Sequence, residues 1–164
     1  MSKKIYINAL VLFVIDQISK AIISTYLSLN ESVVVIKNFF YIKYINNTGA
    51  SFGILKDAKL FLIILSIVAI IIILRYMNSF KKTKLNMIGF SCVLGGILGN
   101  LSDRILFGYV KDFFDFYIFG YDYPVFNFAD IFIVVGVILL VISILRGEDE
   151  HGSKSSRRSK RKNR

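Results

Sequence analysis

The sequence predicts an all-α integral membrane domain of four transmembrane helices, with a small β-rich segment outside the membrane. Apolar residues make up 55% of the chain and the mean hydropathy is +0.60. They are concentrated in long runs such as residues 60–74 and 131–145, which contain no charge. Because about 20 mostly apolar residues cross a bilayer as a helix, the 164 residues leave room for about four spans.

The spans are expected at residues 5–27, 58–76, 85–107 and 124–145. The first is interrupted by Asp16, Gln17 and Lys20 and lacks a small-residue cleavage site, so it is interpreted as a retained helix and not as a signal peptide. The third is rich in glycine, which lets membrane helices approach closely. Pro124, the only proline, fits the start of the fourth span.

Two segments between the spans differ in composition. Residues 30–57 contain runs of β-branched and aromatic residues followed by a turn-forming Asn-Asn-Thr-Gly, which predicts a small β-rich element on the membrane surface. Residues 108–123 are aromatic and partly amphipathic, and we expect this connector to lie in the membrane interface.

The net charge of +10 is placed as in a membrane protein. Basic clusters at the N-terminus, at residues 75–84 and after Arg146 all fall on one side of a four-span chain, which predicts that both termini are cytoplasmic. Residues 1–146 form the membrane domain, and residues 147–164 a disordered basic tail attracted to anionic lipid headgroups. Nucleic-acid binding is not expected, since lipid is the nearer anionic partner.

Ionisable residues inside membrane spans are costly and by default indicate function. Asp16 and Lys20 are spaced i,i+4 on the first span, which favours a structural ion pair. Asn100, Asp103 and Arg104 share one face of the third span. A carboxylate and a guanidinium there are normally paired, with each other or with a neighbouring helix. These two sets therefore predict a scaffold of buried polar contacts.

Asp130 lies in the fourth span, two turns after Pro124 and one turn after Asn127, with no basic residue nearby in that span. Its partner must come from elsewhere, and either Asp112 or Asp115 in the connector could fold back to meet it. Two carboxylates sharing a proton are typical of an aspartic protease. A proton relay through Asp130 explains a buried acid equally well.

The sequence offers few residues for other kinds of catalytic or metal site. The only histidine, His151, is in the tail, so no His-based triad or His-ligated metal site is expected. A Ser–Lys dyad from Ser19, Ser51 or Ser102 with Lys20 is conceivable, but Asp16 already offers Lys20 a partner. The non-peptidase alternatives are a small transporter or proton-conducting protein and a non-catalytic assembly factor.

Five motifs together resemble one family, the bacterial lipoprotein signal peptidases (signal peptidase II). They cover most of the chain up to Arg146 and are Asp16-Gln-Ile-Ser-Lys20, Asn47-Thr-Gly-Ala-Ser-Phe-Gly53, Gly95-Gly-Ile-Leu-Gly-Asn-Leu-Ser-Asp-Arg104, Val110-Lys-Asp-Phe113 and Phe126-Asn-Phe-Ala-Asp130. Each alone is weak, but five in order across four spans are specific. Two departures from the usual pattern are Lys111, whose charge stands beside Asp112, and Ser51 in place of alanine.

The resemblance implies an aspartic endopeptidase that cuts diacylglyceryl-modified prolipoproteins just before the lipidated cysteine, with Asp112 and Asp130 as the catalytic pair. It implies an extracytoplasmic β-cradle, an interfacial helix and an active site near the outer leaflet of the bacterial plasma membrane. Globomycin-type inhibitors, no metal or other cofactor, and a monomer are expected. The positions that match substrate-binding or supporting motifs are Asn47, Gly49, Asn100, Asp103, Arg104, Asn127, Asp16 and Lys20.

Overall fold

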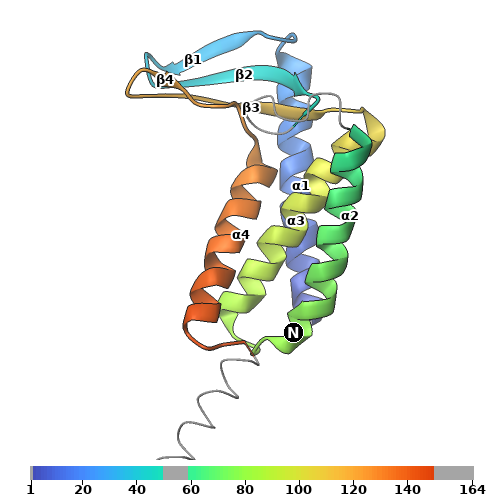
Figure 1. Ribbon diagram of the computed structural model, residues 1–164. Coiled ribbons are helices and arrows are strands. Elements are labelled where there is room, and N and C mark those ends of the chain that lie inside the picture. Colours follow the sequence, from blue (N-terminus) through green and yellow to red (C-terminus); the bar gives the residue numbers. More distant parts are fainter. Residues whose placement is uncertain (1, 50–58, 150–164) are drawn as a thin grey trace, which may run out of the picture.

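The computed structural model describes residues 2–49 and 59–149, in which four long helices form a bundle (Figure 1). The helices are α1 (Ser2–Tyr26), α2 (Lys59–Tyr76), α3 (Lys84–Leu106) and α4 (Phe128–Leu145), and a short 3-10 turn, η2 (Met77–Ser79), follows α2. All four are long and apolar enough to cross a membrane. Four helices are thus present where four spans were predicted, with ends that differ from the expected ones by a few residues.

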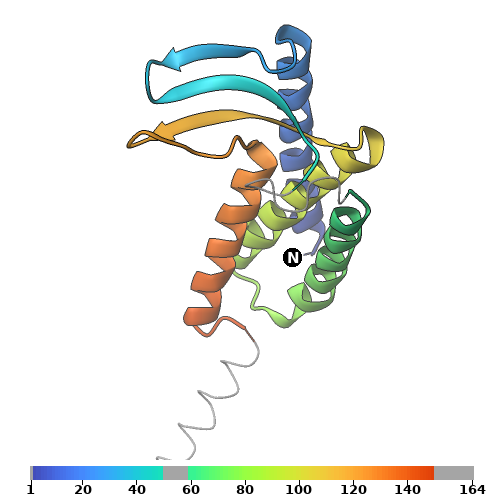
Figure 2. The same ribbon diagram turned by 45° about the horizontal axis from the view of Figure 1, so that its top comes forward.

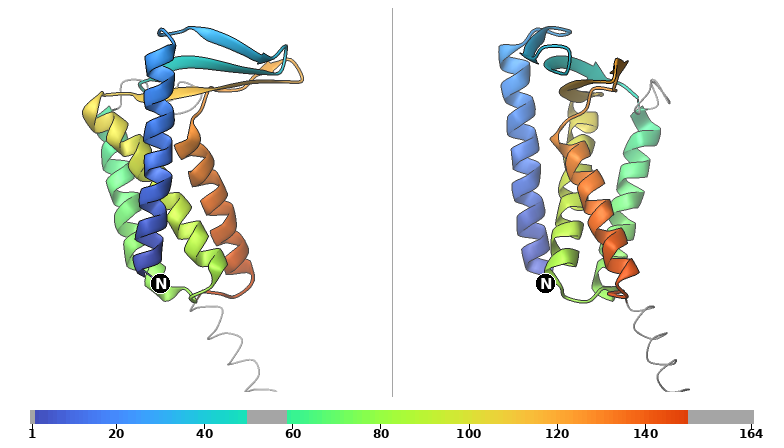
Figure 3. Two further views of the ribbon diagram at one scale, coloured as in Figure 1. Left: turned by 180° about the vertical axis from the view of Figure 1, so that it is seen from behind. Right: turned by 90° about the vertical axis from the view of Figure 1, so that its left-hand side faces the viewer.

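Helix α3 is the central helix of the bundle. Most of its side chains are buried, while α1, α2 and α4 expose rows of Ile, Val and Leu on their outer surfaces. Helices α1, α2 and α4 each contact α3 (Figure 3). Outward-facing apolar side chains need lipid around them, so the three peripheral helices line the membrane-facing surface.

Helices α3 and α4 approach closely where glycines face each other. A Cβ added to Gly136 would lie 2.6 Å from Val93 Cγ2 and 2.8 Å from the carbonyl oxygen of Gly89, so this contact has no space for a methyl group. Small residues at such contacts are the usual device for close packing of membrane helices.

We expect Gly136→Ala to destabilise the fold by about 1–3 kcal/mol, since overpacking forces the backbones of α3 and α4 apart. Equilibrium unfolding in detergent measures the change. Val137→Ala, on the exposed side of the same helix, is the control and should change stability little. Equal effects of the two substitutions would show that the α3–α4 contact tolerates the methyl group.

A four-stranded antiparallel sheet caps one end of the bundle (Figure 2). Its strands are β1 (Ser32–Ile36), β2 (Phe40–Asn47), β3 (Val110–Ile118) and β4 (Tyr121–Asp122), in the order β1-β2-β3-β4. The β-rich prediction for residues 30–57 holds for its described part, whereas residues 50–58, with the end of the Asn47–Gly53 motif and Ser51, lie outside the described residues.

The expectation of an interfacial helix in the 108–123 connector is wrong, because this segment forms β3 and β4. Pairing with β2 over Val110 to Phe116 gives the backbone groups of both strands ladder partners. Alternate side chains can then point to opposite faces of the sheet. The aromatic residues of this segment therefore belong to strands and not to a helix.

The start of the fourth helix also differs from the prediction. Helix α4 begins at Phe128 with Asn127 as its N-cap, whereas Pro124 lies in the connection before it. The Asn127 side chain accepts a hydrogen bond from the Asp130 N–H, and the Asp130 carboxylate accepts one from the Asn127 N–H. This capping box satisfies backbone donors at the helix start. Asp130 is therefore in the first turn of α4 and not two turns inside it.

The N-terminal end of α1 and the C-terminal end of α4 lie at the end of the bundle opposite the sheet (Figure 1). There, Glu148 accepts a hydrogen bond from Thr83 Oγ1 at 2.7 Å, and the Lys81 ammonium donates to the carbonyl of Gly147. These contacts attach the loop between α2 and α3 to the segment that follows α4. The predicted basic tail lies, from residue 150, outside the described residues.

Candidate active site

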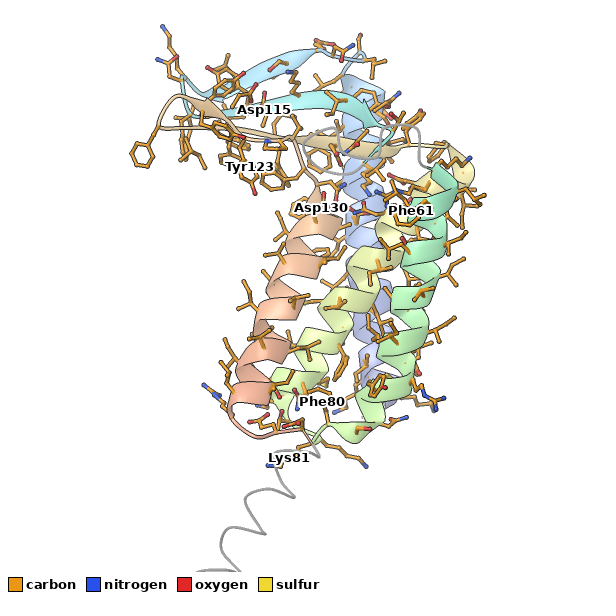
Figure 4. All side chains as sticks on the ribbon, in the orientation of Figure 1. Phe61, Phe80, Lys81, Asp115, Tyr123 and Asp130 are labelled. Carbon is orange, nitrogen blue, oxygen red and sulfur yellow. The ribbon has the colours of Figure 1, made fainter. Side chains whose placement is uncertain are left out.

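Polar side chains from four elements meet where the sheet covers the bundle. Asn47 comes from β2, Asn100 from α3, Asp112 from β3, and Asn127 with Asp130 from the start of α4. Asp130 projects from the first turn of α4 directly beneath the sheet (Figure 4). Residues that are up to 83 positions apart in the sequence therefore form one cluster at the sheet end of the bundle.

Asp112 is 1% exposed and each of its carboxylate oxygens accepts a hydrogen bond from an amide. Asn127 Nδ2 donates to Oδ1 at 2.6 Å, and Asn47 Nδ2 donates to Oδ2 at 2.8 Å. Burial is the main cause that raises the pKa of Asp112, and the negative charge of the nearby Asp130 is the second. The hydrogen bonds from Asn47 and Asn127 lower the pKa, but the net result is a pKa of about 7. Asp112 can therefore hold a proton near neutral pH.

Asp130 is held by a matching set of donors. Asn100 Nδ2 donates to its Oδ1 at 2.8 Å, and the backbone N–H of Asn127 donates to its Oδ2 at 3.1 Å. Asn127, which is fully buried, thus contacts both acids, Asp112 through its side chain and Asp130 through its backbone. One residue sets the relative position of the two carboxyl groups.

A buried charge cluster of Lys20, Asp16 and Asp103 contacts Asn100, which in turn accepts a hydrogen bond from Asn127. The predicted Asp16–Lys20 ion pair is present, with Lys20 Nζ 2.8 Å from Asp16 Oδ2. Lys20 Nζ also lies 3.2 Å from Asp103 Oδ2 and donates to Asn100 Oδ1 at 3.0 Å. Because Lys20 holds Asn100, which in turn contacts Asp130, the charge cluster positions the acid without touching it.

The same carboxylates fix the elements that carry the two acids. Asp16 Oδ1 accepts from the Ala129 N–H in α4 at 2.9 Å, and Asp103 Oδ2 accepts from the Lys111 N–H in β3 at 3.1 Å. Gln17, which sequence reasoning did not select as a site residue, donates to Asp103 Oδ1 at 3.2 Å. Its position next to Asp16 in the first motif is the sequence feature that could have indicated a site role for Gln17.

Two partners were open for Asp103, Arg104 on the same helix or a group on a neighbouring helix, and the structure has the second. Lys20 neutralises Asp103, while the Arg104 guanidinium makes one long hydrogen bond, 3.5 Å, to the carbonyl of Asn100. Its charge is near enough to Asp130 and Asp112 to interact with both. Arg104 therefore supplies a positive charge beside the acids.

The alternation of the strand separates Asp112 from Asp115. Phe114 and Phe116 pack on Phe126 beneath the sheet, with ring centroids 5.6 and 5.8 Å apart, on the same face as Asp112. Asp115 is three positions from Asp112 and so lies on the opposite face, where the sheet separates it from Asp130 (Figure 4). Asp115 therefore does not line the cavity that Asp112 and Asp130 share.

Lys111 likewise points away from Asp112. Its ammonium lies 4.3 Å from the centre of the Phe107 ring and 3.3 Å from Ser24 Oγ. The charge next to Asp112 in sequence is thus on the other face of the strand, directed toward α1 and α3.

Both acids line a cavity of about 280 Å³ between α2, α3, α4 and the sheet. One wall is apolar and comes mainly from α2 and α4, whereas the polar wall contains the predicted site residues Asn47, Gly49, Asn100, Arg104, Asp112 and Asp130. Gly49 adds a backbone N–H that donates to Asn47 Oδ1 at 3.0 Å. The cavity suits a substrate with a polar reacting group and an apolar body.

Among the described residues, neither a Ser19–Lys20 dyad nor a metal site is assembled, and Ser51 lies outside them. Ser19 Oγ donates to the carbonyl of Asp16 at 2.6 Å, and Lys20 is fully engaged by the two carboxylates and Asn100, so they do not form a Ser–Lys dyad. Within residues 2–49 and 59–149, no three His, Cys, Asp or Glu side chains are grouped as a metal site requires.

The fold and site define a polytopic membrane protein with two carboxyl groups, Asp112 buried and Asp130 half-buried, that face one cavity. Comparison with known proteins specifies it further: the family model described as signal peptidase (SPase) II matches residues 8–146. The chain is 42% identical to a lipoprotein signal peptidase of Clostridium tetani over 135 residues, which are 81% of this chain and 86% of that protein. The chain belongs to the signal peptidase II family and is a membrane peptidase.

Two solved structures, each described as a bacterial membrane enzyme, have the same fold. The first is 36% identical with a TM-score of 0.77 and covers 87% of each chain. The second is 34% identical with a TM-score of 0.72, covering 86% of this chain and 92% of the other. The overall fold is therefore shared, over most of this chain, with these two solved structures.

Proposed function

We propose that the protein is an aspartic endopeptidase that removes signal peptides from diacylglyceryl-modified prolipoproteins, cutting just before the lipidated cysteine. One observation supports an aspartic mechanism above the others. Asn127 donates hydrogen bonds to both Asp112 and Asp130, and both acids line the same cavity. Family membership and the name of the Clostridium tetani relative support the substrate class.

The two acids act as a pair that shares one proton. The ionised member takes a proton from a water molecule as the water oxygen bonds to the scissile carbonyl carbon. The protonated member donates its hydrogen bond to the developing oxyanion, with the Arg104 charge nearby. The C–N bond then breaks, and the nitrogen leaves as an amine after taking a proton from the pair. The amides of Asn47, Asn100 and Asn127 keep both carboxyl groups in place throughout.

The position of the cavity suits a substrate that arrives within the membrane. Leu62 and Leu65 of α2 and Ile133 of α4 give it an apolar wall, and the sheet covers its polar end. An apolar signal sequence can enter between these helices while its lipidated cysteine stays at the level of the acids. We place both termini in the bacterial cytoplasm and the site near the outer leaflet, with lipid as partner and a monomer as the working unit.

Cleavage should fall as the pH rises through about 7. The pKa of Asp112 is raised to about 7, so above this pH the pair loses the shared proton and the oxyanion loses its donor. The rate of cleavage at saturating substrate, followed from about pH 5 to 9, checks this. Asp115→Asn is the control and should not change the pH at which the cleavage rate falls. An activity that does not change across this range would contradict a shared-proton pair.

The defining experiment compares two forms of one prolipoprotein in lipid nanodiscs, with and without the diacylglyceryl group on its cysteine. Mass spectrometry of the products should show a single cut before the cysteine, in the lipidated form only. A globomycin-type cyclic peptide should block it. Cleavage elsewhere, or equal cleavage of the unlipidated form, would show that the substrate assignment is wrong.

A further inference from the structure

The free end of the sheet consists of two neighbouring turns, residues 36–39 between β1 and β2 and residues 118–121 between β3 and β4, together called the β-tip. The Tyr117 N–H donates to the carbonyl of Phe39 at 2.9 Å, and the ring of Phe39 packs edge-on against Phe116 with centroids 5.6 Å apart. The two turns therefore form one surface.

The β-tip exposes apolar side chains that its own fold does not cover. Phe119 is fully exposed, at 106% of its reference area. The other exposed apolar residues of the β-tip are Ile36, Phe39, Ile118 and Tyr121, each between 44% and 57%. Single exposed apolar residues are common on proteins, but five on two adjacent turns mark a contact surface.

The backbone at Phe119 is unfavourable for the residue it carries. Phe119 has φ of 51° and is followed by Gly120 at 79°, so both central residues of this hairpin turn are left-handed. Such turns favour Asn-Gly, and the two other described non-glycine residues with positive φ are Asn30 and Asn38. A phenylalanine that is both strained and uncovered within the protein points to a contact outside it.

The β-tip lies where the edge of the bilayer should be. The sheet extends sideways past α4 (Figures 1 and 3), and α4 exposes Val134, Ile138 and Val141 to lipid. With 18 residues, α4 is about 27 Å long at 1.5 Å per residue, close to the thickness of the hydrocarbon core. The sheet lies beyond the first turn of α4 and is then level with the lipid headgroups.

We propose that the β-tip is a membrane anchor, with Phe119 inserted among the lipids of the leaflet on the sheet side. Aromatic side chains favour this interfacial layer, and the exposed Lys37 of the neighbouring turn can meet lipid phosphates. The anchor fixes the far end of β3, the strand that carries Asp112, relative to the bilayer. It does not depend on the proposed peptidase chemistry.

The sequence contains no tryptophan, so Phe119→Trp gives a single fluorescent reporter. The full chain is placed in vesicles of phosphatidylcholine whose acyl chains carry bromine near the headgroup. Strong quenching by the brominated lipid and a blue-shifted emission are expected. Tyr117→Trp is the control: Tyr117 lies within β3, and its ring packs on Tyr41 on the face of the sheet opposite to Phe114 and Phe116. It should be quenched several-fold less by brominated lipid and more by aqueous iodide.

Equal lipid quenching of the two reporters, or red emission at position 119, would overturn the anchor. Tyr121→Trp on the same turn gives a second reading if Phe119→Trp folds poorly, as judged by its thermal melt. A reporter that becomes shielded only when prolipoprotein is added would instead identify the β-tip as a substrate contact and reject the lipid proposal. Because fluorescence is measured without substrate, failure of the anchor leaves the proposed function unaffected, and the reverse also holds.

Discussion

Asp112→Asn and Asp130→Asn should each lower the rate of prolipoprotein cleavage by roughly 10³-fold or more, at the upper range for loss of a positioned acid or base. Each variant keeps the shape of the carboxyl group but cannot share a proton with its partner. Since the two acids work as a unit, the double variant should be little worse than either single one. Cleavage of a lipidated prolipoprotein in detergent measures all three.

Asp115→Asn is the matched control for this pair, because Asp115 is a buried acid on the same strand but on the opposite face. It should retain cleavage within a few-fold of the unmodified enzyme. Thermal melts of all variants separate loss of chemistry from loss of fold. Substantial activity in Asp112→Asn or Asp130→Asn, with the fold intact, would show that the catalytic pair has been misassigned.

Lys20→Met should destabilise the protein by about 3–5 kcal/mol, the usual cost of removing one partner of a buried ion pair. Lys20 is 1% exposed and is the cation for both Asp16 and Asp103. Without it, two carboxylates lose their counter-charge and Asn100 loses the donor that orients it. Activity should fall as well. Unfolding in detergent, with cleavage measured below the transition, checks both effects.

Lys4→Met is the control for this loss, since Lys4 is exposed on the same helix, and it should have almost no effect. Lys20→Met combined with Asp103→Asn should recover part of the stability, because one of the two unpaired charges is then removed. If Lys20→Met behaves like Lys4→Met, the buried cluster is not what holds α1 to α3.

Much of this protein could be predicted from single helices and short motifs. The four spans follow from the lengths of apolar runs, because an isolated helix must satisfy its backbone within itself in lipid. The Asp16–Lys20 pair follows from i,i+4 spacing, because the two side chains lie on one face of one helix. The family resemblance added Asp112 and Asp130 as the acid pair, which the spacing of the residues had left open.

Contacts between elements were decided only by the tertiary structure. The 108–123 connector became a strand because the edge of β2 offered it hydrogen bonds, and local composition does not report that edge. The strand register then placed Asp112 beneath the sheet and Asp115 above it. Similarly, Lys20 and not Arg104 neutralises Asp103, since α1 brings its ammonium to within 3.2 Å. Sequence spacing determines neighbours within one element, whereas packing determines which charges meet across two.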